Sequence, residues 1–557
     1  MKRLSITTLL LFIILGMSSF LRLYKLDSIP PSLYWEEAAL GYDAYSIAKT
    51  GKDHHGNPFP IVAFPSFGDY KPSGYFYAIV PFVFTLGLNV WSVRLPSALA
   101  GIASVLLVYL ICKELFNSKS ALLAAFLFGI QPWAIQFSRG GWEVNLALTV
   151  ILAGAYFLLK SRRKVEYMIL AAICLGLSMY IYHAARLFAP IIGMLGGLWI
   201  LHGFWVKKTL KQNLLPVIIS LVAAILLVSP FVLHLNDSAV SSRFSQTSIF
   251  SDILPIQKSN AAIQAAGNTV VSRLTFHRYR FFAEVIIQQL FSHFSLPFLF
   301  FRGDGNLRHG TGNGGLLYPI ESVGIGIALL IGIVYEAKKL RVQLPQLVLK
   351  VLDSRDYGAA IWVVVLWIII AAVAPALVTP APHALRFLFA APAFAVLSSI
   401  GILHLVGKLS KNMQKLVLLL LVGGYFFFAA RFLSWSILAY PVTSANDWQF
   451  GYKELFSTLD KQKNEGEKVF VSRYQGRPSM YYLFFSKFDP SSLQQIEPTL
   501  SKDQLELLNV GDYYFIDGVG NSPGLYATSP DAVPPQAQVK AFIRRPDTTT
   551  VWVIWRQ

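Results

Sequence analysis

The sequence predicts a mainly α-helical, polytopic membrane protein with a small α/β domain at its C-terminal end. Of its 557 residues, 54% are hydrophobic and only 14% are charged, whereas a soluble protein usually has about 25% charged residues. Apolar stretches close to the ~20 residues that a bilayer requires recur from the N-terminus to Trp435. The apolar excess is therefore organised as spans and does not form one large core.

Eleven segments are long and apolar enough to be predicted as spans. They are residues 4–21, 93–112, 121–137, 143–160, 167–183, 187–204, 214–233, 316–335, 359–378, 385–406 and 416–435. The first follows Lys2 and Arg3 like a signal peptide, but no small-x-small cleavage site follows it, and Arg22 and Lys25 come directly after it. We therefore expect it to remain as a first span.

Basic residues predict the orientation of these spans, because they concentrate in cytoplasmic connections. Every second connection is basic: residues 113–119, 160–164, 207–211, 338–341 and 408–415. Counting the apolar segment 74–90 as a span would reverse this pattern, so we predict an interfacial helix there, with aromatics at the outer boundary. Long outer loops over 22–92 and 234–315 follow, with the C-terminal domain also outside the cytoplasm.

The chain after residue 435 differs from the part before it. Strand-like runs occur at 468–472 and 513–517, and a helical apolar pattern at 480–485 ends before Asp489 and Pro490. We predict two domains, a transmembrane domain over 1–435 and an extracytoplasmic α/β domain over 436–557.

Composition excludes several other classes of protein. The formal charge of +18 comes from basic residues that lie between apolar segments. They form no stripe of interleaved basic and aromatic residues that would bind nucleic acid. Cys112 and Cys174 lie inside apolar runs, so they form no disulfide framework or metal ligand spacing. Asp53, His54 and His55 together indicate an exposed turn. The sequence identifies no cofactor and assigns no metal ligand, while leaving a divalent metal open.

Two adjacent carboxylates, Glu36 and Glu37, directly follow Tyr34 and Trp35. One interpretation is a helix start, since acidic residues suit a first helical turn. The other is catalytic: a carboxylate beside lipid, where desolvation raises its proton affinity, suits a general base acting on a hydroxyl. Both interpretations remain open at this point.

Further polar side chains lie at the predicted outer boundary. Cations are unusual there, because Lys and Arg normally concentrate in cytoplasmic connections. We interpret them as candidate ligands of an anionic substrate, and contacts with lipid headgroups are the alternative for each one. They are Lys71, Arg139, Glu143, His183, Arg186, His383 and Arg386, together with Arg302 and Arg308 of a Gly-rich, aromatic loop that could cover a lipid or sugar.

The order of these elements resembles the family 39 glycosyltransferases, which include the protein O-mannosyltransferases and, more distantly, the aminoarabinose transferases. The resemblance covers roughly residues 1–435. It rests on a short first span, a paired acidic motif, a Lys-Pro element at Lys71 and the run Ser92-Val93-Arg94-Leu95-Pro96-Ser97-Ala98. Phe137-Ser138-Arg139 with Glu143, residues 182–186 and residues 302–309 add to it.

This resemblance implies a GT-C membrane fold and inverting transfer of a sugar from a polyprenyl-phosphate carrier. The acceptor would be a hydroxyl of a protein, glycan or lipid at the outer face of the plasma membrane. Glu36 stands where the family has its aspartate base, and the paired glutamates leave open which of them reacts. Lys71 and Arg186 are the implied partners of the leaving phosphate.

A transporter or flippase of lipid-linked sugars is the main alternative, because it would also have many spans and cations within them. Transporters often carry internal repeats with a site at the membrane midplane. The sequence has no evident repeat, and its ionisable residues concentrate at one boundary. These observations favour the enzyme.

Overall fold

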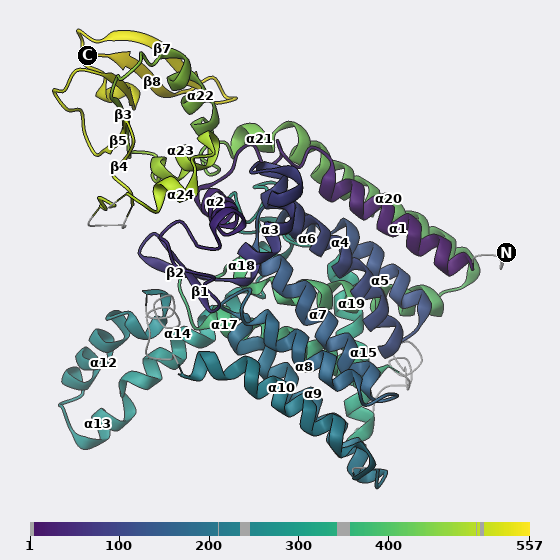
Figure 1. The fold of residues 1–557 in the computed structure, drawn as a ribbon. Coiled ribbons are helices and arrows are strands. Elements are labelled where there is room, and N and C mark those ends of the chain that lie inside the picture. The colour runs from purple at the N-terminus through teal and green to yellow at the C-terminus, as the bar shows by residue number, and fades with distance from the viewer. Residues whose placement is uncertain (1–4, 210, 234–245, 342–356, 497, 502–505) are drawn as a thin grey trace.

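A computed structural model describes residues 5–209, 211–233, 246–341, 357–496, 498–501 and 506–557. Long helices form a bundle, and a small sheet domain stands at one end of it (Figure 1). The predicted fold class is confirmed: the chain is mainly helical, has many membrane-spanning helices and ends in a small domain containing a sheet.

Helices occupy all eleven predicted spans. They are α1 (Ile6–Leu23), α4 (Val90–Leu115), α5 (Ser118–Ile130) with α6 (Pro132–Ser138), α7 (Glu143–Ser161), α8 (Tyr167–Ser178), α9 (Ala185–Val206), α10 (Leu214–Leu233), α15 (Glu321–Lys339), α17 (Gly358–Ala376), α18 (Ala384–Phe387) with α19 (Ala391–Lys408), and α20 (Lys411–Leu438). Among the described residues, nine helices are long and apolar enough to cross a membrane, or ten if the bent pair α5 and α6 forms one span. Two of the helices at predicted spans, α8 with its 12 residues and α15, are not among them. The chain is therefore a multi-pass membrane protein.

Two regions depart from simple straight spans. The axis bends by 58° between α5 and α6, where Pro132 opens α6 and cannot donate a backbone hydrogen bond. Residues 254–301, predicted within an outer loop, instead form α12 (Leu254–Ala265), α13 (Val270–Thr275) and α14 (Arg278–Ser292). The stretch Val270–Phe301 is itself among the nine apolar candidates for a span.

The predicted interfacial segment is the helix α3 (Gly74–Leu86). Its 13 residues extend for about 20 Å, which is shorter than the ~30 Å hydrocarbon layer. It buries Tyr75 and Phe76 and packs on α4 and on α2 (Trp35–Thr50). A hairpin of β1 (Ala63–Ser66) and β2 (Asp69–Pro72) precedes it.

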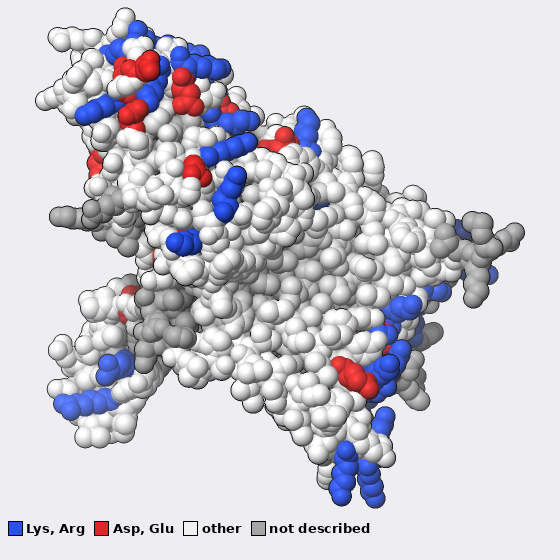
Figure 2. Space-filling model, viewed as in Figure 1, with Lys and Arg blue, Asp and Glu red and all other residues white. Residues whose placement is uncertain are grey.

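Charged residues gather at the two ends of the molecule. Figure 2 shows a broad band almost without charge on this face, with Lys and Arg clustered at the end where α9 is followed by α10. The C-terminal domain and α2 lie at the opposite end (Figure 1). This separation fits spans whose basic connections and sheet domain lie on different sides of one membrane.

The C-terminal domain contains a mixed six-stranded sheet of order β4-β5-β3-β6-β8-β7. The strands are β3 (Val469–Ser472), β4 (Asn509–Val510), β5 (Tyr513–Ile516), β6 (Leu525–Thr528), β7 (Gln538–Arg544) and β8 (Thr550–Arg556). The helices are α21 (Tyr440–Thr443), α22 (Tyr452–Gln462), α23 (Pro478–Ser486) and α24 (Pro490–Leu493). The predicted strands at 468–472 and 513–517 and the helix at 480–485 are confirmed.

This domain packs directly on α2, the helix that carries the paired glutamates. The Tyr481 hydroxyl donates to Leu33 O at 3.1 Å and to Gln449 Oε1 at 2.9 Å, and that same Oε1 accepts from Trp35 N at 3.1 Å. The buried apolar residues of α2, α3 and the sheet domain form one cluster. The start of α2 is therefore fixed by hydrogen bonds with the C-terminal domain, and the helix shares an apolar cluster with α3 and that domain.

Candidate functional site

Glu36 lies in the first turn of α2, next to Lys71 of β2. The Lys71 ammonium is 2.9 Å from Glu36 Oε2, and the side chains are 15% and 26% exposed. The Tyr34 hydroxyl donates to the same oxygen at 3.0 Å. Burial, together with the nearby charges of Glu36 and Glu143, raises the pKa of Tyr34 well above 10, so this hydroxyl keeps its proton. Glu36 is thus oriented by two donors and remains partly open to solvent.

Glu143 is a second carboxylate beside Lys71. It opens α7, and its Oε1 lies 4.0 Å from the Lys71 ammonium. Both Glu36 and Glu143 stand in first helical turns, where the helix dipole favours negative charge. The structure thus brings together three residues singled out from the sequence, Glu36, Lys71 and Glu143, from elements that lie far apart in the chain.

Arg308 approaches the same place from the Gly-rich loop. Its guanidinium lies 5.1 Å from the Tyr34 ring centre and 6.0 Å from that of Trp35, within the range of cation–π attraction. Arg477 of the C-terminal domain lies 5.7 Å from the Trp35 ring. Cations from two distant segments therefore flank the aromatic pair that precedes Glu36.

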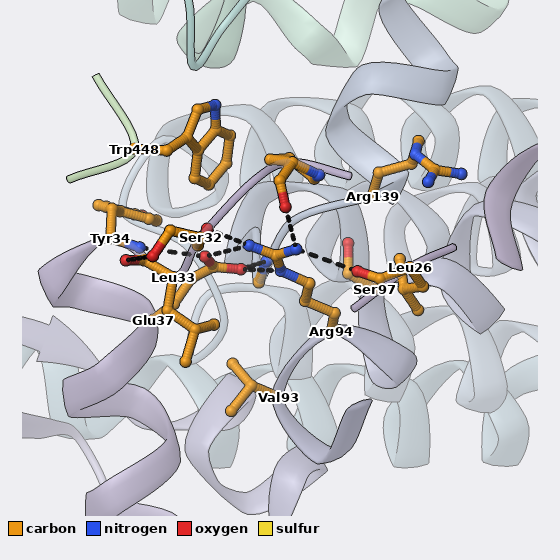
Figure 3. A network of polar contacts seen from close by, with 12 residues as sticks. Leu26, Ser32, Leu33, Tyr34, Glu37, Val93, Arg94, Ser97, Arg139 and Trp448 are labelled. Carbon is orange, nitrogen blue, oxygen red and sulfur yellow. Dashed lines mark hydrogen bonds and ion pairs between the residues drawn. The ribbon is translucent and has the colours of Figure 1, made fainter. Parts of the chain in front are cut away.

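Glu37, by contrast, is fully buried in a network of polar contacts (Figure 3). Its carboxylate accepts from Arg94 Nε at 2.9 Å and Nη2 at 3.1 Å, from Gly141 N at 2.7 Å and from Tyr34 N at 3.3 Å. Arg94 also donates to the carbonyls of Leu26, Pro30 and Ser32. These contacts tie α2 to α4 and to the loop between α1 and α2.

Arg139 has a comparable environment at the end of α6. Its guanidinium donates to Leu21 O at 2.8 Å, Tyr24 O at 2.6 Å and Ile29 O at 2.9 Å. Only 7% of the residue is exposed. The contacts of Arg139 hold the end of α1 and the loop after it.

His183 and Arg186 lie on the segment that packs against the hairpin and α3. His183 Nε2 is 3.2 Å from Tyr70 O, one residue before Lys71, and Gly74 N donates to Tyr180 O at 2.7 Å. The Arg186 guanidinium lies 4.8 Å from the Phe231 ring centre. This segment therefore packs against the strand that carries Lys71 and against the start of α3.

The remaining predicted residues are Arg302, Arg386 and His383. Arg302 is exposed after the π-helix η3 (Pro297–Phe301), and half-buried Arg386 donates to Thr379 O at 2.8 Å. His383 instead faces His309 and Asp304, with ring centres 4.7 Å apart and Nδ1 4.0 Å from Asp304 Oδ2. Burial and the charges of His309 and Arg386 lower the pKa of His383 to about 3, so its ring stays neutral.

Sequence reasoning missed two functional features. The first is the orienting role of Tyr34, for which the only signal was its place before the acidic pair. The second is the cluster of Asp304, His309 and His383, because His383 lies more than 70 residues beyond the other two. Asp53 does form the predicted turn, accepting from His55 N and Asn57 N, but it is fully buried rather than exposed.

Part of the chain is similar to a known protein family. Residues 71–234 match the family model of the dolichyl-phosphate-mannose-protein mannosyltransferases. The predicted resemblance to family 39 glycosyltransferases is confirmed. The family-39-like segment contains Lys71, Arg139, Glu143, His183 and Arg186.

Two proteins of Bacillus subtilis, provisionally named mannosyltransferases, are similar to part of the chain. YkcB is 30% identical over 161 residues, which is 28% of this chain and 21% of YkcB. YycA is 28% identical over 123 residues, which is 20% of this chain and 18% of YycA. The chain thus spans only about a fifth of the length of these curated relatives.

Two solved structures also match. The ArnT protein of Cupriavidus metallidurans bound to undecaprenyl phosphate has a TM-score of 0.48 and 12% identity, with 98% of this chain and 97% of that chain covered. The oligosaccharyltransferase AglB of Archaeoglobus fulgidus, in complex with an inhibitory peptide and a dolichol-phosphate, has a TM-score of 0.46 and 17% identity, with 86% and 63% covered.

Proposed function

We propose that this chain is an inverting glycosyltransferase that moves a sugar from a polyprenyl-phosphate carrier to an acceptor hydroxyl on the outer face of the membrane. The observation that carries the proposal is the Glu36–Lys71 pair, a partly exposed carboxylate 2.9 Å from an ammonium group. A base for the hydroxyl and a cation for the phosphate are the two groups that this transfer requires. The match of residues 71–234 to the mannosyltransferase family supports the assignment.

The transfer itself is a single displacement at the anomeric carbon. The acceptor oxygen attacks from the side opposite the phosphate while its proton passes to the Glu36 carboxylate. The bond from the anomeric carbon to the phosphate oxygen breaks, and the phosphate leaves with the electron pair. Lys71 stabilises the charge that develops there, and the configuration of the sugar is inverted.

Glu36 rather than Glu37 is the proposed base because of their different surroundings. Glu37 is fully buried, and four N–H groups donate to its two oxygens. An acceptor could reach it only by displacing these donors. We assign Glu37 the role of positioning the start of α2. We propose that His183 and Arg186 contribute, with Lys71, to the site of the donor phosphate.

The experiment uses the full chain in lipid nanodiscs, which lack a second compartment and so give no transport signal. Polyprenyl phosphates carrying mannose or aminoarabinose are supplied with a Ser/Thr peptide, a glycan and a lipid as acceptors. We expect the protein to release polyprenyl phosphate from at least one donor and to form a product of inverted configuration. Intact donors in every combination would contradict the enzyme and favour a transporter, and retained configuration would contradict the single displacement.

A further inference from the structure

A cluster of three potential metal ligands lies where the Gly-rich loop meets the start of α18. Asp304, His309 and His383 each offer one ligand atom, and these atoms all lie within 4.8 Å of one another. His309 Nδ1 is 3.5 Å and His383 Nδ1 is 4.0 Å from Asp304 Oδ2. Ligands held about 2.0–2.1 Å from a tetrahedral ion are about 3.3 Å apart, so small side-chain movements would complete the site.

The two histidine nitrogens provide independent evidence for a ligand. Within the described part of the chain, Nδ1 of His309 and Nδ1 of His383 are buried and have no hydrogen-bond partner. The two side chains are only 10% and 13% exposed. Buried polar atoms are normally paired, and two unpaired imidazole nitrogens beside one carboxylate are a donor set that suits a metal ion.

Neighbouring groups hold these ligands in place. Asp304 Oδ2 accepts from Ala384 N at 2.8 Å, and its Oδ1 accepts from Asn306 N at 2.9 Å. His383 N donates to His293 Nε2 at 3.2 Å, and His293 Nδ1 lies 2.7 Å from Gln289 O. Outer contacts of this kind orient the ligands in metal sites.

We infer that Asp304, His309 and His383 bind a divalent transition metal ion of the zinc type. Two imidazoles and one carboxylate suit zinc, whereas magnesium and calcium prefer oxygen ligands. Three protein ligands leave a fourth position for water. The site uses none of the residues assigned to the proposed transfer, so the inference does not depend on that transfer.

The ion would fix the position of the loop that carries Arg308. Asp304 and His309 stand on either side of Arg308 in sequence, and His383 belongs to the chain before α18. Cross-linking these two segments fixes the loop whose Arg308 lies over the rings of Tyr34 and Trp35. The metal is thus a positioning element for that cation.

Metal content tests the inference directly. The full chain, purified without a histidine tag and incubated with zinc, should retain about one ion per chain after desalting. His309→Gln, His383→Gln and Asp304→Asn should each lose it, whereas His277→Gln, at an exposed position, should not. Cobalt added to the metal-free protein should show the visible absorption of a four-coordinate site, and substituting any ligand should abolish it.

Trypsin gives a second readout that does not require the variants to fold. Cleavage after exposed Arg302 should accelerate when a chelator removes the ion from the unmodified protein, and added zinc should restore protection. Zinc retention equal in the three ligand variants and the unmodified protein would overturn the inference. So would an unmodified protein that binds neither zinc nor cobalt, or a cleavage rate that the chelator leaves unchanged.

Discussion

Replacing Glu37 by glutamine should mainly destabilise the protein. The substitution removes the only carboxylate that contacts Arg94 in the described contacts, and both side chains are fully buried. Removing one partner of a buried ion pair costs about 3–5 kcal/mol, because the other charge is left buried and uncompensated. Arg94 keeps its contacts with Leu26 O, Pro30 O and Ser32 O, so we expect the lower end, about 3 kcal/mol.

A double-mutant cycle measures this coupling. The free energy of unfolding is determined by SDS titration in mixed micelles for Glu37→Gln, Arg94→Gln and the double variant. The sum of the two single losses of stability should exceed the loss of the double variant. The difference, which is the interaction energy, should lie toward the upper end of the usual range of about 0.5–3 kcal/mol. Glu284→Gln is the matched control, since its ion pair with Arg280 is half exposed and worth at most about 1 kcal/mol.

One result would refute this reasoning. If Glu37→Gln is as stable as the Glu284→Gln control and yet loses all turnover, then Glu37 is the reacting carboxylate. The network with Arg94 would in that case serve to orient a base. A loss of stability in the double variant equal to the sum of the two single losses would likewise show that the two side chains do not stabilise each other.

Two further predictions concern the donor and the orientation. Lys71→Met should weaken binding of a polyprenyl phosphate by roughly 10- to 100-fold, the value of a charge-assisted hydrogen bond of about 1.5–3 kcal/mol, and unchanged affinity by titration calorimetry would exclude Lys71 as a phosphate ligand. In intact cells, a membrane-impermeant thiol reagent should label Ser457→Cys and spare Lys164→Cys, both exposed positions, and the opposite labelling would reverse the proposed topology.

Much of the bundle could be predicted because span length and basic connections are local properties of the sequence. The helices at 254–292 were missed because their apolar residues are interleaved with Lys258, Arg273, Arg278 and Arg280. Their pattern lacks a continuous apolar run, so it was interpreted as a loop. The α3 segment is a helix, as predicted, and its 13 residues are shorter than a span. Its interfacial position stays a prediction.

The candidate site was predictable only in part. Consecutive helical residues point about 100° apart, so Glu36 and Glu37 must face different neighbours, but sequence alone does not identify those neighbours. The partner of Glu37 is Arg94, 57 residues later, and the partner of Glu36 is Lys71 on a hairpin. Arg139 was predicted as a substrate ligand because it is a cation at a boundary, and sequence alone did not indicate its partners, which are carbonyls at the end of α1 and in the loop after it.

The turnover of Glu36→Gln tests the central claim most directly. Glutamine keeps the size of the side chain and can still accept from Tyr34, but it cannot take a proton from the acceptor. A positioned base contributes about 100- to 10,000-fold, so kcat in nanodiscs should fall by this factor while donor affinity stays within about threefold of the unmodified protein, a difference below 1 kcal/mol. Near-normal kcat in Glu36→Gln, with full turnover in the Glu284→Gln control, would contradict the account.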